Sequence, residues 1–142
     1  MNNTTLILDS SVIAKWFFPE NDSEKVLKIK ESFTNNTVSV VIPVLLYYEI
    51  NNLLKTAIKM FRINENDAIK VYKAFLKLNF VSYSSELLLE KTLETAVRFD
   101  ISSYDASYVA LAEYLQVTFL TADQRLLQRV SSKFVIDLKE YT

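Results

Sequence analysis

Short β-rich runs alternate with helical segments along almost the whole chain, and this alternation is the feature that most restricts the fold. The run around Val40 is nearly all apolar and β-branched, which is the pattern of a strand buried on both faces of a sheet. Strands that alternate with helices favour a parallel sheet with helices on both sides. We therefore expect an α/β fold with three layers, α/β/α, around a central parallel sheet.

The boundaries of these segments follow from apolar periodicity and from capping and turn residues. The expected strands are Thr5–Asp9, Val38–Ile42, Phe80–Tyr83, Val117–Leu120 and Phe134–Leu138. The expected helices are Ser10–Phe18, Glu24–Phe33, Val44–Phe61 with Pro43 at its start, Glu65–Leu78, Ser85–Phe99, Ser103–Leu115 opened by Ser102, and Ala122–Val130. We find no internal repeat, low-complexity tract or linker, so residues 1–142 are expected to form a single domain.

The composition excludes several kinds of chemistry, because the chain contains no glycine, histidine or cysteine. Without glycine, neither a P-loop nor a dinucleotide-binding fingerprint can form. Without histidine and cysteine, catalysis by imidazole or thiol groups is absent. Turns must then use Asn, Asp and Ser, as at Asn35-Asn36, Asn64 and Ser84-Ser85. The net charge of −1 gives no overall basic field for nucleic acid, although a metal ion bound at a nuclease site would reverse the local sign.

The sequence shows no signal for export or for membrane insertion. The N-terminal residues MNNTTLILDSS lack the basic region and long apolar stretch of a signal peptide. The longest apolar runs fall short of the ~20 residues that a membrane-spanning helix needs. We therefore expect a soluble protein of the cytoplasm.

Four acidic residues, from distant parts of the chain, stand where an apolar segment meets a turn or opens a helix: Asp9, Glu49, Asp105 and Asp123. Carboxylates held together in an apolar cleft repel one another and resist ionisation. A hard divalent cation relieves that repulsion, and ligands that are all oxygen favour magnesium or manganese over zinc. Because ligands gather at the carboxyl ends of parallel strands, Asp9 and Asp123 are expected on the same edge of the sheet. This pattern favours a metal-dependent hydrolase.

Each acid also has a structural explanation. Asp9 fits a helix N-cap, and Asp105 fits a capping box with Ser102. At the start of the last helix we expect Thr121 to be the cap and Asp123 to be favoured by the helix dipole. Glu49 is different, because it lies in the middle of a helix on the apolar side and needs a partner if it is buried. A salt bridge to Lys or Arg is the structural alternative for Glu49.

The segments DSSVIAKWF, YYEINNLL, SSYDASYVALAEYL and LTADQRLL together resemble the PIN domains, and most closely the VapC-type toxins of toxin–antitoxin pairs. The resemblance runs nearly from end to end in the expected order and spacing. It implies an α/β fold with a parallel sheet, endoribonuclease activity that depends on magnesium or manganese, and inhibition by a small antitoxin protein. It also favours a homodimer.

Carried over by motif, Asp9, Glu49, Asp105 and Asp123 match the acidic quartet of that family, as catalytic residues and as metal ligands. Ser11 matches a small hydroxyl residue after the first Asp, and its role stays open. One or two metal ions would activate a water molecule, and a carboxylate such as that of Glu49 would orient this water or take its proton.

An RNA substrate needs cationic and aromatic contacts around the acidic residues. We expect Arg125 to be the most important cation, since it stands two residues after Asp123. The other candidate cations are Lys15, Lys55, Lys59, Arg62 and Arg129. Aromatic residues crowd the first and third helices, where most should be core and some should serve a dimer surface or an antitoxin groove: Trp16, Phe17, Phe18, Tyr47, Tyr48 and Phe61.

Three other functions are alternatives to a toxin nuclease. A phosphatase of the haloacid-dehalogenase type is rejected, because it needs a second Asp two residues after the first and this chain has Ser11 there. A PIN-fold nuclease of RNA processing and a degenerate PIN module that only binds protein both remain open.

Overall fold

A central parallel sheet organises the computed structural model, which describes residues 3–19 and 24–142. In this part of the chain the sheet has five strands in the order β3-β2-β1-β4-β5, and every neighbouring pair is parallel. The strands are β1 (Thr4–Leu8), β2 (Val38–Pro43), β3 (Val81–Tyr83), β4 (Thr118–Thr121) and β5 (Val135–Asp137). The expected parallel sheet is therefore confirmed.

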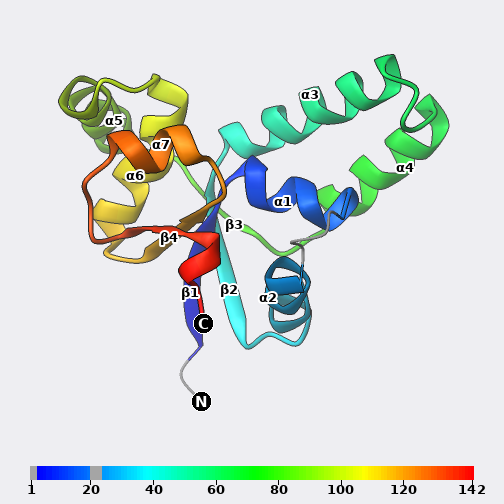
Figure 1. Ribbon diagram of the computed structural model, residues 1–142, viewed down its shortest axis with the longest axis horizontal. Helices are drawn as coiled ribbons and strands as arrows, with labels where there is room; N and C mark the ends of the chain where they lie inside the picture. The colour runs from blue at the N-terminus through cyan, green and yellow to red at the C-terminus, as the bar shows by residue number, and fades with distance from the viewer. Residues whose placement is uncertain (1–2, 20–23) are drawn as a thin grey trace.

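Helices cover both faces of this sheet and form the outer layers of a three-layer α/β/α arrangement. Figure 1 shows α1 and α2 on one side of the strands and α5, α6 and α7 on the other, while α3 and α4 form a hairpin that extends away from the sheet. The helices are α1 (Ser10–Phe17), α2 (Glu24–Thr34), α3 (Leu45–Lys59), α4 (Glu65–Leu76), α5 (Glu86–Phe99), α6 (Ser103–Leu115) and α7 (Gln124–Arg129), with a short 3-10 helix, η1 (Leu138–Glu140), after β5. Among the described residues, no helix is both long enough and apolar enough to cross a membrane.

The strands at the centre of the sheet are buried because both of their faces are covered. Leu6, Ile7 and Leu8 of β1 are almost fully buried, although consecutive side chains of a strand point to opposite faces. The edge strands β3 and β5 have three residues each, and none of these residues is buried. The core therefore follows β1, β2 and β4, and the ends of these strands are rigidly positioned.

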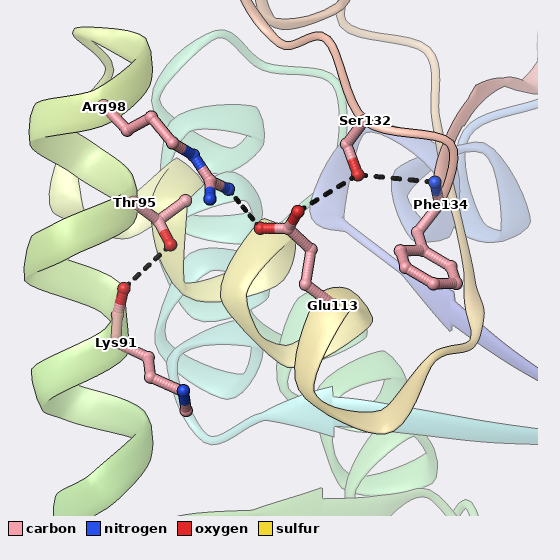
Figure 2. Close-up of polar contacts among 6 residues, drawn as sticks. All are labelled: Lys91, Thr95, Arg98, Glu113, Ser132 and Phe134. Atoms are coloured by element: carbon pink, nitrogen blue, oxygen red, sulfur yellow. Dashed lines mark hydrogen bonds and ion pairs between the residues drawn. The ribbon is translucent and has the colours of Figure 1, made fainter.

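Side-chain contacts tie α5 and α6 to the loop before β5. Figure 2 shows the guanidinium of Arg98 in α5 paired with the carboxylate of Glu113 in α6, which in turn accepts a hydrogen bond from the Ser132 hydroxyl at 3.5 Å. The same hydroxyl accepts the backbone N–H of Phe134 at 3.4 Å. These contacts fix the loop that leads into β5.

The absence of glycine forces other residues into the left-handed backbone region. Asn36, Phe61, Asp100 and Gln116 have φ between 52° and 61°. Asp100 and Gln116 cap the ends of α5 and α6, where the chain must reverse. Asn and Asp tolerate this conformation better than Phe or Gln, which have no short side-chain hydrogen bond to offset the steric cost.

The expected place of Pro43 is wrong. Pro43 does not open a helix but ends β2, and α3 begins at Leu45. The pairing of β2 with β1 stops at Val41, whereas the pairing with β3 continues to Pro43. The missing N–H of Pro43 therefore falls where the β1 side of the strand needs no donor, which is where a sheet tolerates proline.

Candidate active site

Asp9 lies at the carboxyl end of β1 and is held by hydroxyl groups on both of its oxygens. Its Oδ1 accepts hydrogen bonds from the Ser11 hydroxyl at 2.5 Å and from the backbone N–H of Val12 at 3.3 Å. Its Oδ2 accepts a hydrogen bond from the Thr121 hydroxyl at 2.6 Å. Asp9 is therefore the N-cap of α1, as expected, but it is also tied to the end of β4.

The end of β4 is connected to the start of α1 by the same hydroxyl groups. The Ser11 hydroxyl accepts the backbone N–H of Ala122 at 3.0 Å, and its oxygen lies 3.4 Å from that of Thr121. The Thr121 hydroxyl also accepts the backbone N–H of Asp123 at 3.0 Å. Ser11, whose role the sequence left open, thus joins two strand ends.

The expected cap of α7 is wrong. Asp123 is the N-cap, and its Oδ1 accepts the backbone N–H groups of Arg125 at 3.0 Å and Leu126 at 3.2 Å. Thr121 cannot cap α7, because it is the last residue of β4 and its hydroxyl donates to Asp9. The helix begins two residues later than a Thr121 cap would require.

Glu49 lies in α3 with its carboxylate half-buried and pointing toward α6. Its Oε1 accepts a hydrogen bond from the phenol of Tyr108 at 2.5 Å, and its Oε2 accepts one from the Ser10 hydroxyl at 3.4 Å. Both of these partners, within the residues that the structure describes, are hydroxyl groups rather than the lysine or arginine of the salt-bridge alternative. Two neutral donors orient the carboxylate without neutralising its charge.

The sequence analysis missed Tyr108. This side chain is buried and its ring stacks on Phe119 of β4, with the centroids 5.4 Å apart. It stands three residues after Asp105 in α6, so both residues face the same side of the helix, one turn apart. That spacing was the available signal, because a tyrosine beside a buried carboxylate needs a hydrogen-bond partner.

The four acids form a series of electrostatic neighbours. Burial raises the pKa of the Asp9 carboxyl from 3.8 to about 6, and the charge of Glu49 adds to this rise. Burial likewise raises the pKa of Glu49, with a contribution from Asp105. Burial raises the pKa of Asp105 as well, with a contribution from Asp123, while Arg125 opposes it. The pKa values of these three carboxyls are thus raised mainly by burial and in part by a neighbouring acid.

The matching protein family agrees with this geometry. The sequence profile of the PIN domain matches residues 6–133. The chain belongs to the PIN-domain family. Ribonuclease VapC1 of Mycobacterium tuberculosis is 32% identical over 123 residues, which cover 84% of this chain and 86% of that protein. Ribonuclease VapC3 of Pyrobaculum aerophilum is 28% identical over 129 residues, which cover 87% of this chain and 93% of that protein.

Solved structures show the same fold. The crystal structure of PAE2754 from Pyrobaculum aerophilum matches 98% of this chain and 93% of its own, with a TM-score of 0.67 and 25% identity. The structure of VapBC-1 from nontypeable Haemophilus influenzae matches 96% of this chain and all of its own, with a TM-score of 0.67 and 16% identity. The sequence-based assignment to PIN domains of the VapC type is confirmed.

The donor set of this PIN domain suits a divalent cation, and PIN-domain ribonucleases in general depend on such ions. All four side chains offer hard oxygen ligands, and burial raises the pKa values of Asp9, Glu49 and Asp105. Within residues 3–19 and 24–142, however, no group of three acidic side chains is close enough to hold a metal ion.

Two cavities of this PIN domain adjoin the acids. One has a volume of about 490 Å³, lies between α1 and α3, and is lined by Glu49 and Ser10 among others. The other has a volume of about 270 Å³ and is lined by Asp105 and Asp123 together with Arg125. Glu49 therefore borders one cavity, while Asp105 and Asp123 border the other.

Proposed function

We propose that this protein is a metal-dependent endoribonuclease and the toxin of a toxin–antitoxin pair, acting in the cytoplasm. The observation that carries this proposal is the series of electrostatically neighbouring carboxylates Asp9, Glu49, Asp105 and Asp123, in which burial raises the pKa values of the first three. The kinship with VapC ribonucleases over more than four fifths of the chain supports it. The neighbours of known structure include toxin–antitoxin complexes, which supports a small antitoxin protein as partner.

The four acidic side chains would divide two tasks of phosphodiester hydrolysis, metal binding and proton transfer. A magnesium or manganese ion held by Asp9, Asp105 and Asp123, with Glu49 alongside, would supply Lewis acidity for attack on the phosphorus and stabilise charge on the leaving oxygen. The hydroxyl groups of Ser11 and Thr121 fix the carboxylate of Asp9 in one orientation. Restricting Asp9 in this way lowers the entropic cost of binding a cation.

Glu49 is suited to take a proton from the attacking water. The phenol of Tyr108 holds one of its oxygens, and the Ser10 hydroxyl lies 3.4 Å from the other, a long hydrogen bond. Burial raises the pKa of Glu49 above its usual value, which brings this base closer to neutral pH, where a general base is most effective. Histidine, the commonest general base, is absent from the chain.

The proposal is tested by incubating a structured RNA with the purified protein in magnesium, in manganese and in a chelator. We expect internal cleavage with either metal and none with the chelator, and loss of cleavage in the Asp105→Asn variant with an unchanged circular dichroism spectrum. Cleavage that persists in the chelator, or in that variant, contradicts the metal mechanism. RNA that stays intact while a protein partner binds points instead to the non-catalytic module.

The toxin assignment is tested separately from the chemistry. We expect induced expression to stop bacterial growth, and co-expression of a short protein encoded next to this gene to restore it. Growth that is unaffected by an active nuclease favours a PIN enzyme of RNA processing. Sedimentation equilibrium of the purified protein tests the homodimer that we also propose.

Arg125 is the cation best placed to bind a phosphate of the RNA. It lines the smaller cavity with Asp105 and Asp123, and its charge opposes the rise in the pKa of Asp105. Each phosphate contact to single-stranded nucleic acid contributes about 0.7 to the slope of log affinity against log salt. We expect Arg125→Ala to reduce that slope by about this amount in an anisotropy titration. Lys28→Ala, which removes an exposed cation paired with Glu24 on α2, should leave the slope unchanged.

A further inference from the structure

The larger cavity, between α1 and α3, has a different chemical character from the smaller one. One face of α3 lines it, since Glu49, Asn52 and Thr56 recur at helical spacing and all border the same space. Apolar side chains supply much of the remaining wall, including Ala57 and Met60. A cavity of about 490 Å³ that begins at Glu49 thus combines an acidic end with an apolar wall.

A planar stacking surface forms part of this wall. The guanidinium of Arg62 lies over the ring of Phe18, 4.7 Å from its centroid, and both residues line the cavity. Phe18 is half-buried and packs against the core, so it supports Arg62 from beneath. Arg62 itself is exposed, which leaves the outer face of the guanidinium available. Proteins that bind single-stranded RNA stack bases on aromatic rings and on arginine planes of this kind.

A free amide group lies between this stacking surface and the acids. Asn52 is exposed and lines the cavity one turn after Glu49. Its side chain has no hydrogen-bond partner in the part of the chain that the structure describes. An amide offers two N–H donors and one carbonyl acceptor, and so matches the polar edge of a nucleobase.

We propose that this cavity is a subsite for one nucleobase of the RNA, next to the phosphate that is cleaved, and that it sets the sequence preference of the enzyme. Arg62, supported by Phe18, stacks on the base, and Asn52 hydrogen-bonds to its edge. The inference rests on the proposed endoribonuclease function. The phosphate is assigned to the opposite side, because the smaller cavity carries Arg125 and has less apolar wall.

The test compares variants that differ in one contact. Asn52→Ala removes the amide that faces the cavity, whereas Asn51→Ala removes the neighbouring amide of the same helix, which lines a separate groove between α3 and α4. Arg62→Lys keeps the charge but removes the planar stacking group. Both asparagines and Arg62 are exposed, so these variants should fold, and thermal unfolding verifies it.

Cleavage of a short RNA library with randomised positions, read by sequencing, gives the base preference beside the cut. We expect the preference at one adjacent position to fall by about tenfold in Asn52→Ala and to stay intact in Asn51→Ala. We expect Arg62→Ala and Arg62→Lys to raise KM by about tenfold alike, because both variants lose the planar stacking group, although only Arg62→Ala also loses the charge. Arg125→Ala should weaken binding of all sequences equally.

A second measurement separates this inference from the proposed activity. Anisotropy titrations with the four homopolymeric RNA hexamers detect a base subsite without any cleavage. If the protein cleaves RNA but Asn52→Ala and Asn51→Ala have the same sequence profile and the same hexamer affinities, the subsite is refuted and the nuclease stands. If no RNA is cleaved yet Asn52→Ala alone loses hexamer discrimination, the subsite stands and the catalytic proposal fails.

Discussion

Replacing Asp9 with asparagine should stabilise the metal-free protein at neutral pH while abolishing its activity. Asp9 is 7% exposed, and burial raises the pKa of its carboxyl from 3.8 to about 6. The folded protein therefore binds this proton more tightly than the unfolded chain does. The contribution of the protonated Asp9 carboxyl to the free energy of unfolding is fully present below about pH 4, and it is lost as the pH rises through about 6. At 1.36 kcal/mol for each pKa unit, the ionised carboxylate costs about 3 kcal/mol at pH 7.

Asparagine retains the shape of this side chain and removes the charge. Its amide oxygen can still accept the hydrogen bonds of Ser11 and Val12, and the Thr121 hydroxyl can rotate to accept from the new N–H₂ group. In a chelator, we expect the free energy of unfolding of Asp9→Asn to exceed that of the wild type by up to about 3 kcal/mol at pH 7. The difference should disappear near pH 4.

Urea unfolding followed by circular dichroism, from pH 4 to pH 7.5, measures these values. The control is Asp67→Asn, an exposed carboxylate at the start of α4, which should change stability by about 0.5 kcal/mol or less. Magnesium should stabilise the wild type by mass action and leave Asp9→Asn unaffected. A wild-type protein whose metal-free stability rises between pH 4 and pH 6.5, or a destabilised Asp9→Asn at pH 7, would refute the reasoning.

Three further substitutions test other parts of the structure. Tyr108→Phe keeps the stack on Phe119 but removes the donor to Glu49, so manganese affinity measured by calorimetry should fall about tenfold with little change in melting temperature; unchanged affinity would show that Glu49 is positioned without Tyr108. Gln116→Gly removes the steric cost of the left-handed backbone conformation at the end of α6, and it should add about 1 kcal/mol to the free energy of unfolding. Gln128→Gly in α7 should subtract about as much; equal effects of the two glycines would contradict the backbone explanation.

The sequence predicted the elements of the fold well because their signals are local. The β-branched run of β2 and the Ser102 cap of α6 each identify an element without any tertiary information. The prediction for Pro43 was wrong because its place depends on which strand pairs with each edge of β2. The left-handed conformation of Phe61 was also beyond a sequence argument, because it follows from how α3 must end before α4.

The site was predictable in its composition but not in its connections. The sequence predicted that Asp9 and Asp123 lie on one edge of the sheet. In the structure Asp9 follows β1 and Asp123 follows the neighbouring strand β4, and the Thr121 hydroxyl makes a hydrogen bond to each of them. The hydrogen-bond partner of Glu49 could not be predicted from the sequence, because either a cation or a phenol can donate to a buried carboxylate. The structure places Tyr108 beside Glu49 because α6 packs against both β2 and β4.

The strand order explains why the site lies where it does. From β1 the chain leads to β2 on one side of the sheet, while β4 flanks β1 on the other side, so the ends of β1 and β4 form a topological switch point. Folds of this class often use the free N–H groups of a helix at such a point to bind phosphate directly. In this chain Asp9 caps α1 and Asp123 caps α7, so carboxylates occupy those N–H groups and repel an anion. A phosphodiester must then be attracted by positive charge, which a divalent cation bound by the carboxylates would supply together with Arg125. This is the physical reason why the proposed activity should depend strictly on metal.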